Sequence, residues 1–340
     1  MLNRRTARFN WFDSNTLRHT SVKCYGSTAV SKTAGEGSTP STGAINRISM
    51  HKDFFGYEHP IICSSMNGVS DINLALACAK AGIVPSLTMA PITWYLDKLP
   101  SYLEMFRDEL GHCNLILGVI IPVRYQELED YILRLVEKYE ISHCEFIFLT
   151  DPDKHDSFVK KLHDLRCKVL RKQVVAFRER NEYDALITCG NESAGYSDTL
   201  STKKLFVIQR TVTPDVPVIA SGGISTRAQI KEYLDLGALA VSIGTLFAMS
   251  EESTIALSTK KVMIEKTSRD LSRMKLSGLQ GIVRRDVEKD DDQDRPIDYR
   301  LKKGILGELD DGVIFAGTGI DQINEILPVQ EIVNRLVNDS

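Results

Sequence analysis

The sequence predicts a (β/α)8 TIM barrel, preceded by an N-terminal arm and followed by a C-terminal helical extension. From residue 60 onward, short apolar runs alternate with longer segments of helical periodicity, which is typical of parallel βα units. Eight such units fit a closed barrel better than a doubly wound sheet, which normally has fewer strands. Apart from this βα rhythm the chain shows neither an internal repeat nor a second core-forming region.

The eight predicted strands share short length and apolar composition, and they cover residues 60–65, 83–88, 115–120, 144–149, 168–174, 184–189, 216–221 and 239–244. Helical segments lie between them, beginning with residues 71–82, whose apolar positions recur at helical spacing. In residues 225–237, Ser225 or Thr226 is placed to cap the N-terminus of a helix and Gly237 to end it.

Three further segments follow the last predicted strand. Residues 251–280 are predicted to form a helix that is followed by the sequence SGLQG. The dense charge run at 284–298 is typical of a solvated loop. Residues 326–337 form an amphipathic pattern, which predicts a helix that packs back on the barrel. We therefore assign residues 51–340 to the barrel and its extension.

Composition excludes several classes of partner. The chain has 340 residues, of which 43% are hydrophobic and 26% charged, and a formal net charge of −3; this balance offers no basic face for nucleic acid. No apolar run approaches the roughly 18 residues of a membrane span. The seven cysteines are scattered singly, which favours reduced thiols over a zinc site or disulfides and predicts a cytoplasmic protein.

Residues 1–50 differ in composition from the rest of the chain. They are rich in serine, threonine and arginine, and Asp13 and Glu36 are their only acidic residues. This composition occurs in organelle transit peptides. The aromatic sequence RFNWF favours the other interpretation, a polar arm that packs against the barrel.

Glycines follow two neighbouring predicted strands. Gly222 and Gly223 come directly after Ser221 at the end of the seventh strand, and Gly244 and Thr245 end the eighth. Glycine lets backbone N–H groups approach an anion closely, and the loops after the seventh and eighth strands are where barrel phosphate sites form. We therefore predict a phosphate site here; the alternative is that these glycines only make tight turns.

Four segments resemble the nitronate monooxygenase (2-nitropropane dioxygenase) family, which is related to flavin-type enoyl-ACP reductases and, more distantly, to IMP dehydrogenase and GMP reductase. The sequence PVIASGGISTRAQIKEYLDLGALAVSIGTLFAMSEES is similar to the flavin-phosphate region of that family. The other three segments are HPIICSSMNGVSDINLALACAKAGIVPSL at 59–87, DALITCGNESAGYSD at 184–198 and GVIFAGTGIDQINEILPVQEIVNRL at 312–336. The resemblance covers about residues 55–337.

The resemblance implies FMN as cofactor. It places the phosphate at the glycine turns, on Ser221, Gly222, Gly223, Gly244 and Thr245. It places the isoalloxazine ring near the end of the first strand, at Ser64, Ser65, Met66 and Gly68. Lys172, late in the fifth strand, could offset negative charge on the reduced flavin, or it could be a surface lysine.

Two positions depart from the pattern of the family. The family has a pair of glycines followed by a catalytic histidine in the sixth-strand loop, whereas this chain has Ala194, Gly195 and Tyr196. Tyrosine has an ordinary pKa near 10, so it is a poor base at neutral pH but a usable acid or hydrogen-bond donor. Ile120 stands where the family has an asparagine near the flavin. Glu192 matches a carboxylate of the family loop and could instead bind backbone N–H groups.

The sequence thus predicts an FMN-dependent oxidoreductase acting on a small organic substrate, with Tyr196, Glu192 and Lys172 as candidate catalytic residues. One alternative is a flavin-free nucleotide oxidoreductase of the IMP dehydrogenase or GMP reductase type, which needs a cysteine nucleophile. Cys189 ends the predicted sixth strand and is interpreted as a buried strand-end residue. The other alternative is a catalytically silent flavin- or phosphate-binding protein. The sequence leaves open whether oxygen or NAD(P)H reacts with the flavin and whether the chain forms a homo-oligomer.

Overall fold

The computed structural model of the chain describes residues 50–89, 98–119, 126–147, 152–173, 182–195, 197, 199–276, 279–284 and 297–338. The predicted N-terminal arm lies outside the described residues except for Met50. Its packing and any role in targeting therefore stay predictions.

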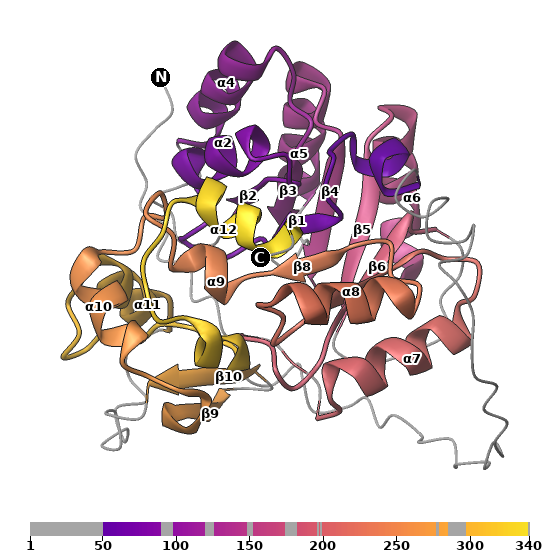
Figure 1. Cartoon of the computed structure of the whole chain (residues 1–340). Helices are drawn as coiled ribbons and strands as arrows, with labels where there is room; N and C mark the ends of the chain where they lie inside the picture. The colour runs from indigo at the N-terminus through magenta and orange to yellow at the C-terminus, as the bar shows by residue number, and fades with distance from the viewer. Residues whose placement is uncertain are drawn as a thin grey trace, which may run out of the picture.

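Eight parallel strands form the barrel, in the order β1-β8-β7-β6-β5-β4-β3-β2 (Figure 1). Their bounds are β1 Ile61–Cys63, β2 Ser86–Met89, β3 Ile116–Val119, β4 His143–Ile147, β5 Lys168–Gln173, β6 Ala185–Cys189, β7 Val218–Ser221 and β8 Val241–Ile243. The barrel closes between the chain's first two strands through a parallel bridge from Ile62 to Val84. Each strand overlaps one of the eight predicted runs, so the prediction of a (β/α)8 TIM barrel is confirmed.

Helices cover the outside of the strands. They are α2 Ile72–Lys80, α4 Leu99–Leu110, α5 Gln126–Tyr139, α6 Pro152–Asp164, α7 Thr202–Val212, α8 Arg227–Asp235, α9 Thr245–Ala248, α10 Leu257–Ile264, α11 Ile297–Leu306 and α12 Val329–Val337, with 3-10 turns η1 Ser268–Asp270 and η2 Thr318–Gln322. The cap of α8 is Thr226, one of the two predicted residues, in a capping box with Gln229. Within the described residues no helix is long and apolar enough to span a bilayer.

The interior of the barrel is apolar at the level of the strand centres. Ile62, Ile116, Leu170 and Ile219 belong to one cluster of almost completely buried side chains. The same cluster contains Phe55, the last of the helical residues 50–55. This aromatic side chain therefore helps to close the barrel at the end where the strands begin.

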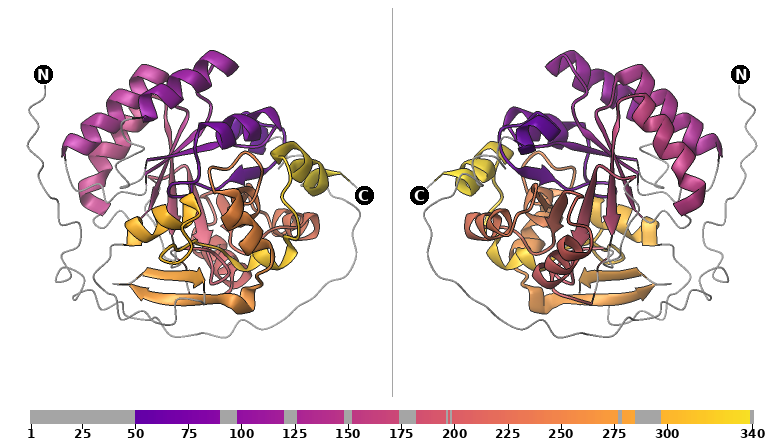
Figure 2. Two further views of the ribbon diagram at one scale, coloured as in Figure 1. Left: turned by 90° about the vertical axis from the view of Figure 1, so that its left-hand side faces the viewer. Right: turned by 90° about the vertical axis from the view of Figure 1, so that its right-hand side faces the viewer.

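The region after β8 corrects one prediction and confirms another. The helix predicted over 251–280 is present only as α10, which begins at Leu257 and ends at Ile264; β9 Leu271–Leu276 and β10 Leu279–Arg284 instead form an antiparallel hairpin. The serine-glycine dipeptide at 277–278 is a turn signal between two strands. Figure 2 shows this hairpin at the edge of the molecule opposite α4, α5 and α6. The predicted C-terminal helix is present as α12 and contacts α2 and α8.

Candidate functional site

A polar layer lies inside the barrel, one step beyond the apolar layer toward the ends of the strands. Side chains two residues apart on a strand point to the same side, so Ser64 follows Ile62 and Lys172 follows Leu170 on the inner face. The members of this layer are Ser64, Ser86, Thr88, Glu145, Lys172, Ser221 and Ser242, and all but Lys172 are buried. Burying so many polar groups is unfavourable unless each of them has a hydrogen-bond partner in the protein or in a bound molecule. The layer therefore marks the barrel mouth as the candidate site.

Glu145 connects three strands within this layer. Its carboxylate accepts a hydrogen bond from the Ser65 hydroxyl at 2.9 Å. It also forms an ion pair with Lys172, at 3.2 Å between Nζ and Oε1. Gly118 on β3 provides the space for this arrangement, because a Cβ at that position would collide with the Ser65 side chain. Two residues expected at the flavin, Ser65 and Lys172, are thus joined by a glutamate that the sequence analysis missed.

The ion pair keeps Lys172 charged. Burial is the largest single effect and lowers the pKa of Lys172, but its neighbours, Glu145 first among them, together outweigh burial and leave that pKa above its ordinary value. Cys189 lies in the same region and is buried; burial raises the pKa of its thiol. A thiol with a raised pKa is protonated at neutral pH and is a poor nucleophile. This agrees with the interpretation of Cys189 as a buried strand-end residue.

Four consecutive side chains in the loop after β1 contact four different parts of the site. The Ser64 hydroxyl lies 2.5 Å from that of Ser242 on β8, and Ser65 reaches Glu145. The Met66 sulfur lies 3.6 Å from the position that a Cβ on Gly244 would occupy, and Asn67 contacts Asp298 of α11. Gly68 follows, with a positive φ of 72°. The first-strand and eighth-strand candidate residues therefore lie together at one rim.

The two glycines after β7 serve packing as well as turning. Gly222 and Gly223 have φ values of 123° and 68°, which disfavour any residue with a side chain. A Cβ on Gly222 would collide with the Ser193 hydroxyl, and one on Gly223 would come within 2.8 Å of the Glu192 Cβ. Close packing of the sixth and seventh loops thus explains part of the glycine pattern without any ligand.

The same loops also present unused donors. Among the described residues, no acceptor bonds the backbone N–H groups of Gly223 or Gly244. Ser221 lies directly before the first loop, and Thr245 begins α9 directly after the second. By contrast, the N–H groups of Ser225 and Thr226 at the start of α8 are already bonded to the Gln229 side chain, so we assign them no part in phosphate binding.

A C-terminal strap, residues 316–322, joins these loops from outside. The Gly317 N–H donates to the Thr245 hydroxyl at 2.9 Å, and the Thr318 N–H donates to the carbonyl of Glu192 at 3.0 Å. These residues were not predicted to belong to the site. The only signal was the Gly-Thr-Gly sequence at 317–319 after an apolar run.

Of the two candidate catalytic residues in the sixth-strand loop, the structure describes Glu192. Glu192 accepts hydrogen bonds from the Thr202 N–H at 2.7 Å and the Thr202 hydroxyl at 2.8 Å. Its carboxylate therefore stabilises the first turn of α7, as in the second interpretation of this residue given above. Tyr196 and Ile120 lie outside the described residues, so their proposed roles stay predictions.

The histidine side chains that the structure describes lie away from this rim. His51 packs on Phe55, and His143 at the start of β4 lies 3.1 Å from the carbonyl of Phe54. His59, His112 and His163 occupy segments that precede β1, β3 and β5. All of these positions belong to the opposite end of the barrel, so none of these imidazoles stands at the mouth as a base.

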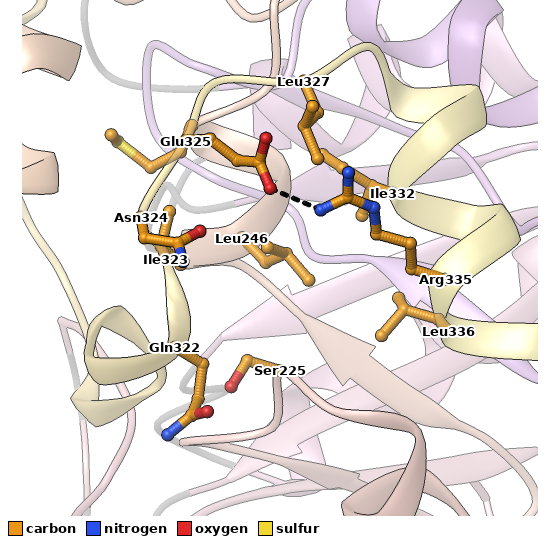
Figure 3. Close-up of a pocket in the computed structure, with 11 residues that line it drawn as sticks. Ser225, Leu246, Gln322, Ile323, Asn324, Glu325, Leu327, Ile332, Arg335 and Leu336 are labelled. Atoms are coloured by element: carbon orange, nitrogen blue, oxygen red, sulfur yellow. Dashed lines mark hydrogen bonds and ion pairs between the residues drawn. The ribbon is translucent and has the colours of Figure 1, made fainter. Parts of the chain in front are cut away.

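A small pocket lies on the outer side of the seventh and eighth loops (Figure 3). Its walls mix apolar and polar side chains from α9, α12 and the residues around the end of η2, with Leu246 and Leu336 among the apolar ones. Ser225 lies at its base with a buried hydroxyl that has no hydrogen-bond partner. Arg335 and Glu325 pair at its opening, 2.5 Å apart. This pocket is separate from the polar layer inside the barrel.

The residues at the mouth fit an FMN-type ligand in chemistry. Backbone N–H groups that have no acceptor within the described part of the chain, beside hydroxyls, suit the phosphate, and a buried cation suits a ring that becomes negative on reduction. The unsatisfied hydroxyls of Ser86 and Thr88 in the polar layer are consistent with a site built to hold a polar molecule.

Comparisons with known proteins found a matching family model and curated relatives. The model of the family "Nitronate monooxygenase" matches residues 87–339, more than half of the chain. A probable nitronate monooxygenase of Bacillus subtilis (strain 168) is 26% identical over 243 residues, covering 63% of this chain and 69% of that protein. A (3aS,4S,5R,7aS)-5-hydroxy-7a-methyl-1-oxo-octahydro-1H-indene-4-carboxyl-CoA dehydrogenase of Mycobacterium tuberculosis (strain ATCC 25618 / H37Rv) is 25% identical over 216 residues, covering 62% and 58%.

Two solved structures share the fold. FabK from Thermotoga maritima superposes with a TM-score of 0.72 at 23% identity, covering 84% of this chain and 94% of that one. Nitroalkane oxidase from Streptomyces ansochromogenes gives a TM-score of 0.66 at 18% identity, with coverage of 85% and 96%.

Proposed function

Because the chain belongs to the nitronate monooxygenase family, a family of FMN-dependent oxidoreductases, we propose that it binds FMN at the barrel mouth and acts there on a small organic substrate. The observation that carries the proposal is the Lys172–Glu145 ion pair, which lies in a polar layer next to two loops whose N–H groups at Gly223 and Gly244 have no acceptor among the residues that the structure describes. FMN, when bound, supplies reversible transfer of a hydride to or from the substrate.

The loops after β7 and β8 would hold the phosphate. In this proposal the backbone N–H groups of Gly223 and Gly244 donate to it, and Gly222 allows the close turn. The hydroxyls of Ser221 and Thr245 add two further donors. Thr245 can donate its hydroxyl hydrogen while its oxygen accepts from Gly317.

The β1 loop and Lys172 would border the ring. Ser64, Ser65 and Met66 form the wall on that side, with Gly68 turning the chain away from it. Lys172, kept charged by Glu145, would stabilise negative charge that develops when the cofactor is reduced.

The residues of the sixth loop would face the substrate. Tyr196 would donate a proton or a hydrogen bond to it, and Glu192 would fix the loop by its bonds to Thr202. We infer reduction of an electron-poor double bond by NAD(P)H rather than base-initiated oxidation of a nitronate. The support is that every described histidine side chain lies at the other end of the barrel, whereas the mouth offers a cation and hydroxyl donors.

Two assays on the FMN-loaded protein test this function. Anaerobic oxidation of NAD(P)H in the presence of crotonyl-CoA should be catalysed, whereas oxygen uptake with propyl-2-nitronate should be slow. Rapid oxygen uptake with the nitronate would reverse the assignment. A yellow protein that is inert in both assays would instead support the silent flavin binder.

A further inference from the structure

We propose that Lys260 positions the phosphate loop after β8 by fixing the segment 249–253, which directly follows α9; this role rests on the FMN phosphate site proposed above. Lys260 lies in α10, within the stretch that was predicted as one helix over 251–280, and no role was predicted for it. It is only 4% exposed, whereas lysine is almost never fully buried unless its charge has partners.

Three backbone carbonyl groups surround the Lys260 ammonium. Its Nζ donates to the carbonyls of Ser250 at 2.5 Å, Ser253 at 3.0 Å and Glu251 at 3.3 Å. An ammonium group has three N–H donors and no acceptor, so these bonds use it completely and require it to be protonated. A buried charge is costly unless such partners compensate it. The segment 249–253 is therefore held with its carbonyls turned toward one cation.

The same segment continues α9, the helix that begins at the phosphate loop. The Ser253 hydroxyl donates to the carbonyl of Ala248, the last residue of α9, at 2.5 Å. Because α9 has only four residues, about one helical turn separates this bond from Gly244 and Thr245. A displacement of the carbonyls that bind Lys260 would therefore reach the donors of the phosphate site.

The segment also contacts α12. Both carboxylate oxygens of Glu252 lie 3.0 Å from the N–H of Val329, at the start of that helix. Burial lowers the pKa of Lys260, and Glu252 is first among the nearby charges that oppose this effect. Lys260, α9 and α12 thus fix the segment together. A binding loop needs this kind of support, because a site that is about 1 Å too loose loses its function.

The position of Lys260 predicts which part of a flavin it affects. Its partners continue the loop that is proposed to hold the phosphate, whereas the ring is proposed to lie at the β1 loop and Lys172. A change at Lys260 should therefore weaken binding of FMN more than binding of riboflavin, which lacks the phosphate. A residue that only stabilises the fold would affect both flavins equally.

Fluorescence titration with FMN and with riboflavin tests this difference. Lys260→Met should bind FMN about tenfold more weakly, while its affinity for riboflavin stays within about twofold. Lys261→Met, which alters the exposed neighbouring lysine, should change neither affinity. Thr259→Val removes the bond from the Thr259 hydroxyl to the Gly304 carbonyl; it should lower the thermal midpoint without changing the ratio of the two affinities. Equal losses for FMN and riboflavin in Lys260→Met, or no loss for FMN, would overturn the proposal.

Ser253→Ala is the milder variant and keeps the test sharp if Lys260→Met does not fold. It removes the bond to Ala248 but leaves the Ser253 carbonyl on Lys260. It should also lower the affinity for FMN relative to riboflavin. An unchanged ratio in a folded Ser253→Ala protein would show that the segment does not position α9, and the proposal would fail.

Chemical rescue tests the cation itself. Lys260→Ala leaves the three carbonyls without a cation, and propylammonium chloride supplies the missing carbons together with an ammonium group. Propylammonium should restore FMN affinity in this variant, whereas tetramethylammonium at the same concentration should not, because it has no N–H donor. Equal recovery with both salts, or none with either, would contradict the role of Lys260. A folded wild-type protein that binds neither flavin would instead overturn the proposed function, and this role with it.

Discussion

Glu145 of β4 and Lys172 of β5 form an ion pair inside the barrel, with only 1% of the glutamate side chain and 15% of the lysine side chain exposed. Two charges buried in this way are tolerated because each has the other, and because the Ser65 hydroxyl satisfies the second carboxylate oxygen. The pair costs desolvation energy that an apolar pair would not. The pair lies directly below the mouth, where its charges can act on a bound molecule, and such a function would explain why a pair with this desolvation cost is present.

Removing one member of the pair should be strongly destabilising. We expect Lys172→Met to lower the free energy of unfolding by about 3–5 kcal/mol, because it leaves a buried carboxylate without a cation. Adding Glu145→Gln should recover part of that loss. Urea denaturation of the two single variants and the double variant measures the coupling, and losses that simply add would show that the pair does not interact.

The pair should also set the reduction potential of the bound flavin. Lys172→Met should lower the midpoint potential, because it removes a cation that favours the reduced anion, and Glu145→Gln should raise it. Lys168→Met is the matched control, since the Lys168 ammonium lies at the other end of the same strand, on the Phe54 carbonyl. Dye-linked redox titration checks this, and equal shifts for Lys172→Met and Lys168→Met would contradict it.

The glycines of the two loops should respond differently to alanine. Gly223→Ala should destabilise the fold by about 1–2 kcal/mol or more, because φ is 68° and the new Cβ would meet Glu192 and Thr318. At Gly244 the new Cβ would find only ordinary contacts, at 3.6 Å or more. We therefore expect Gly244→Ala to keep its thermal midpoint but to bind FMN about tenfold more weakly, near 1.4 kcal/mol. Unchanged FMN affinity would remove Gly244 from the phosphate site.

Two buried histidines should make the protein sensitive to acid. Burial lowers the pKa of His143 to about 3 and that of His51 to about 4, whereas in the unfolded chain both titrate near 6.5. Below about pH 6.5 the unfolded chain therefore binds more protons, and the free energy of unfolding should fall by up to ~1.4 kcal/mol per pH unit for each histidine. This loss should continue until about pH 4.

Urea denaturation between pH 7 and pH 5 measures this slope. His143→Phe should reduce it by about half, because one of the two neutral rings no longer titrates. A slope that is the same in the variant and the wild type would show that other groups cause the acid sensitivity.

The strands were predictable because each is a short apolar run, and burial of those runs on both faces is what forms a parallel barrel. The site was only partly predictable. Ser64, Ser65 and Lys172 lie at the C-terminal ends of predicted strands. In a barrel of alternating strands and helices these ends surround the mouth that carries the site. Glu145 was missed although an acid within the apolar run CEFIFL was a usable signal, because a strand sequence alone does not say which cation lies opposite.

Two other features depended on contacts between distant parts of the chain. Asp298 belongs to a charge run that is typical of solvent, and only the folded chain brings it to Asn67. Strand β9 was predicted as the last part of a helix over 251–280. The pairing of Leu271 with Arg284 joins two segments of backbone, and the sequence of either segment alone does not reveal it.

Titration of the purified protein with FMN is the decisive experiment for cofactor binding at the barrel mouth. We expect a yellow protein that binds one FMN per chain and quenches its fluorescence. A protein that remains colourless and leaves FMN fluorescence unchanged, while circular dichroism shows it to be folded, would contradict it.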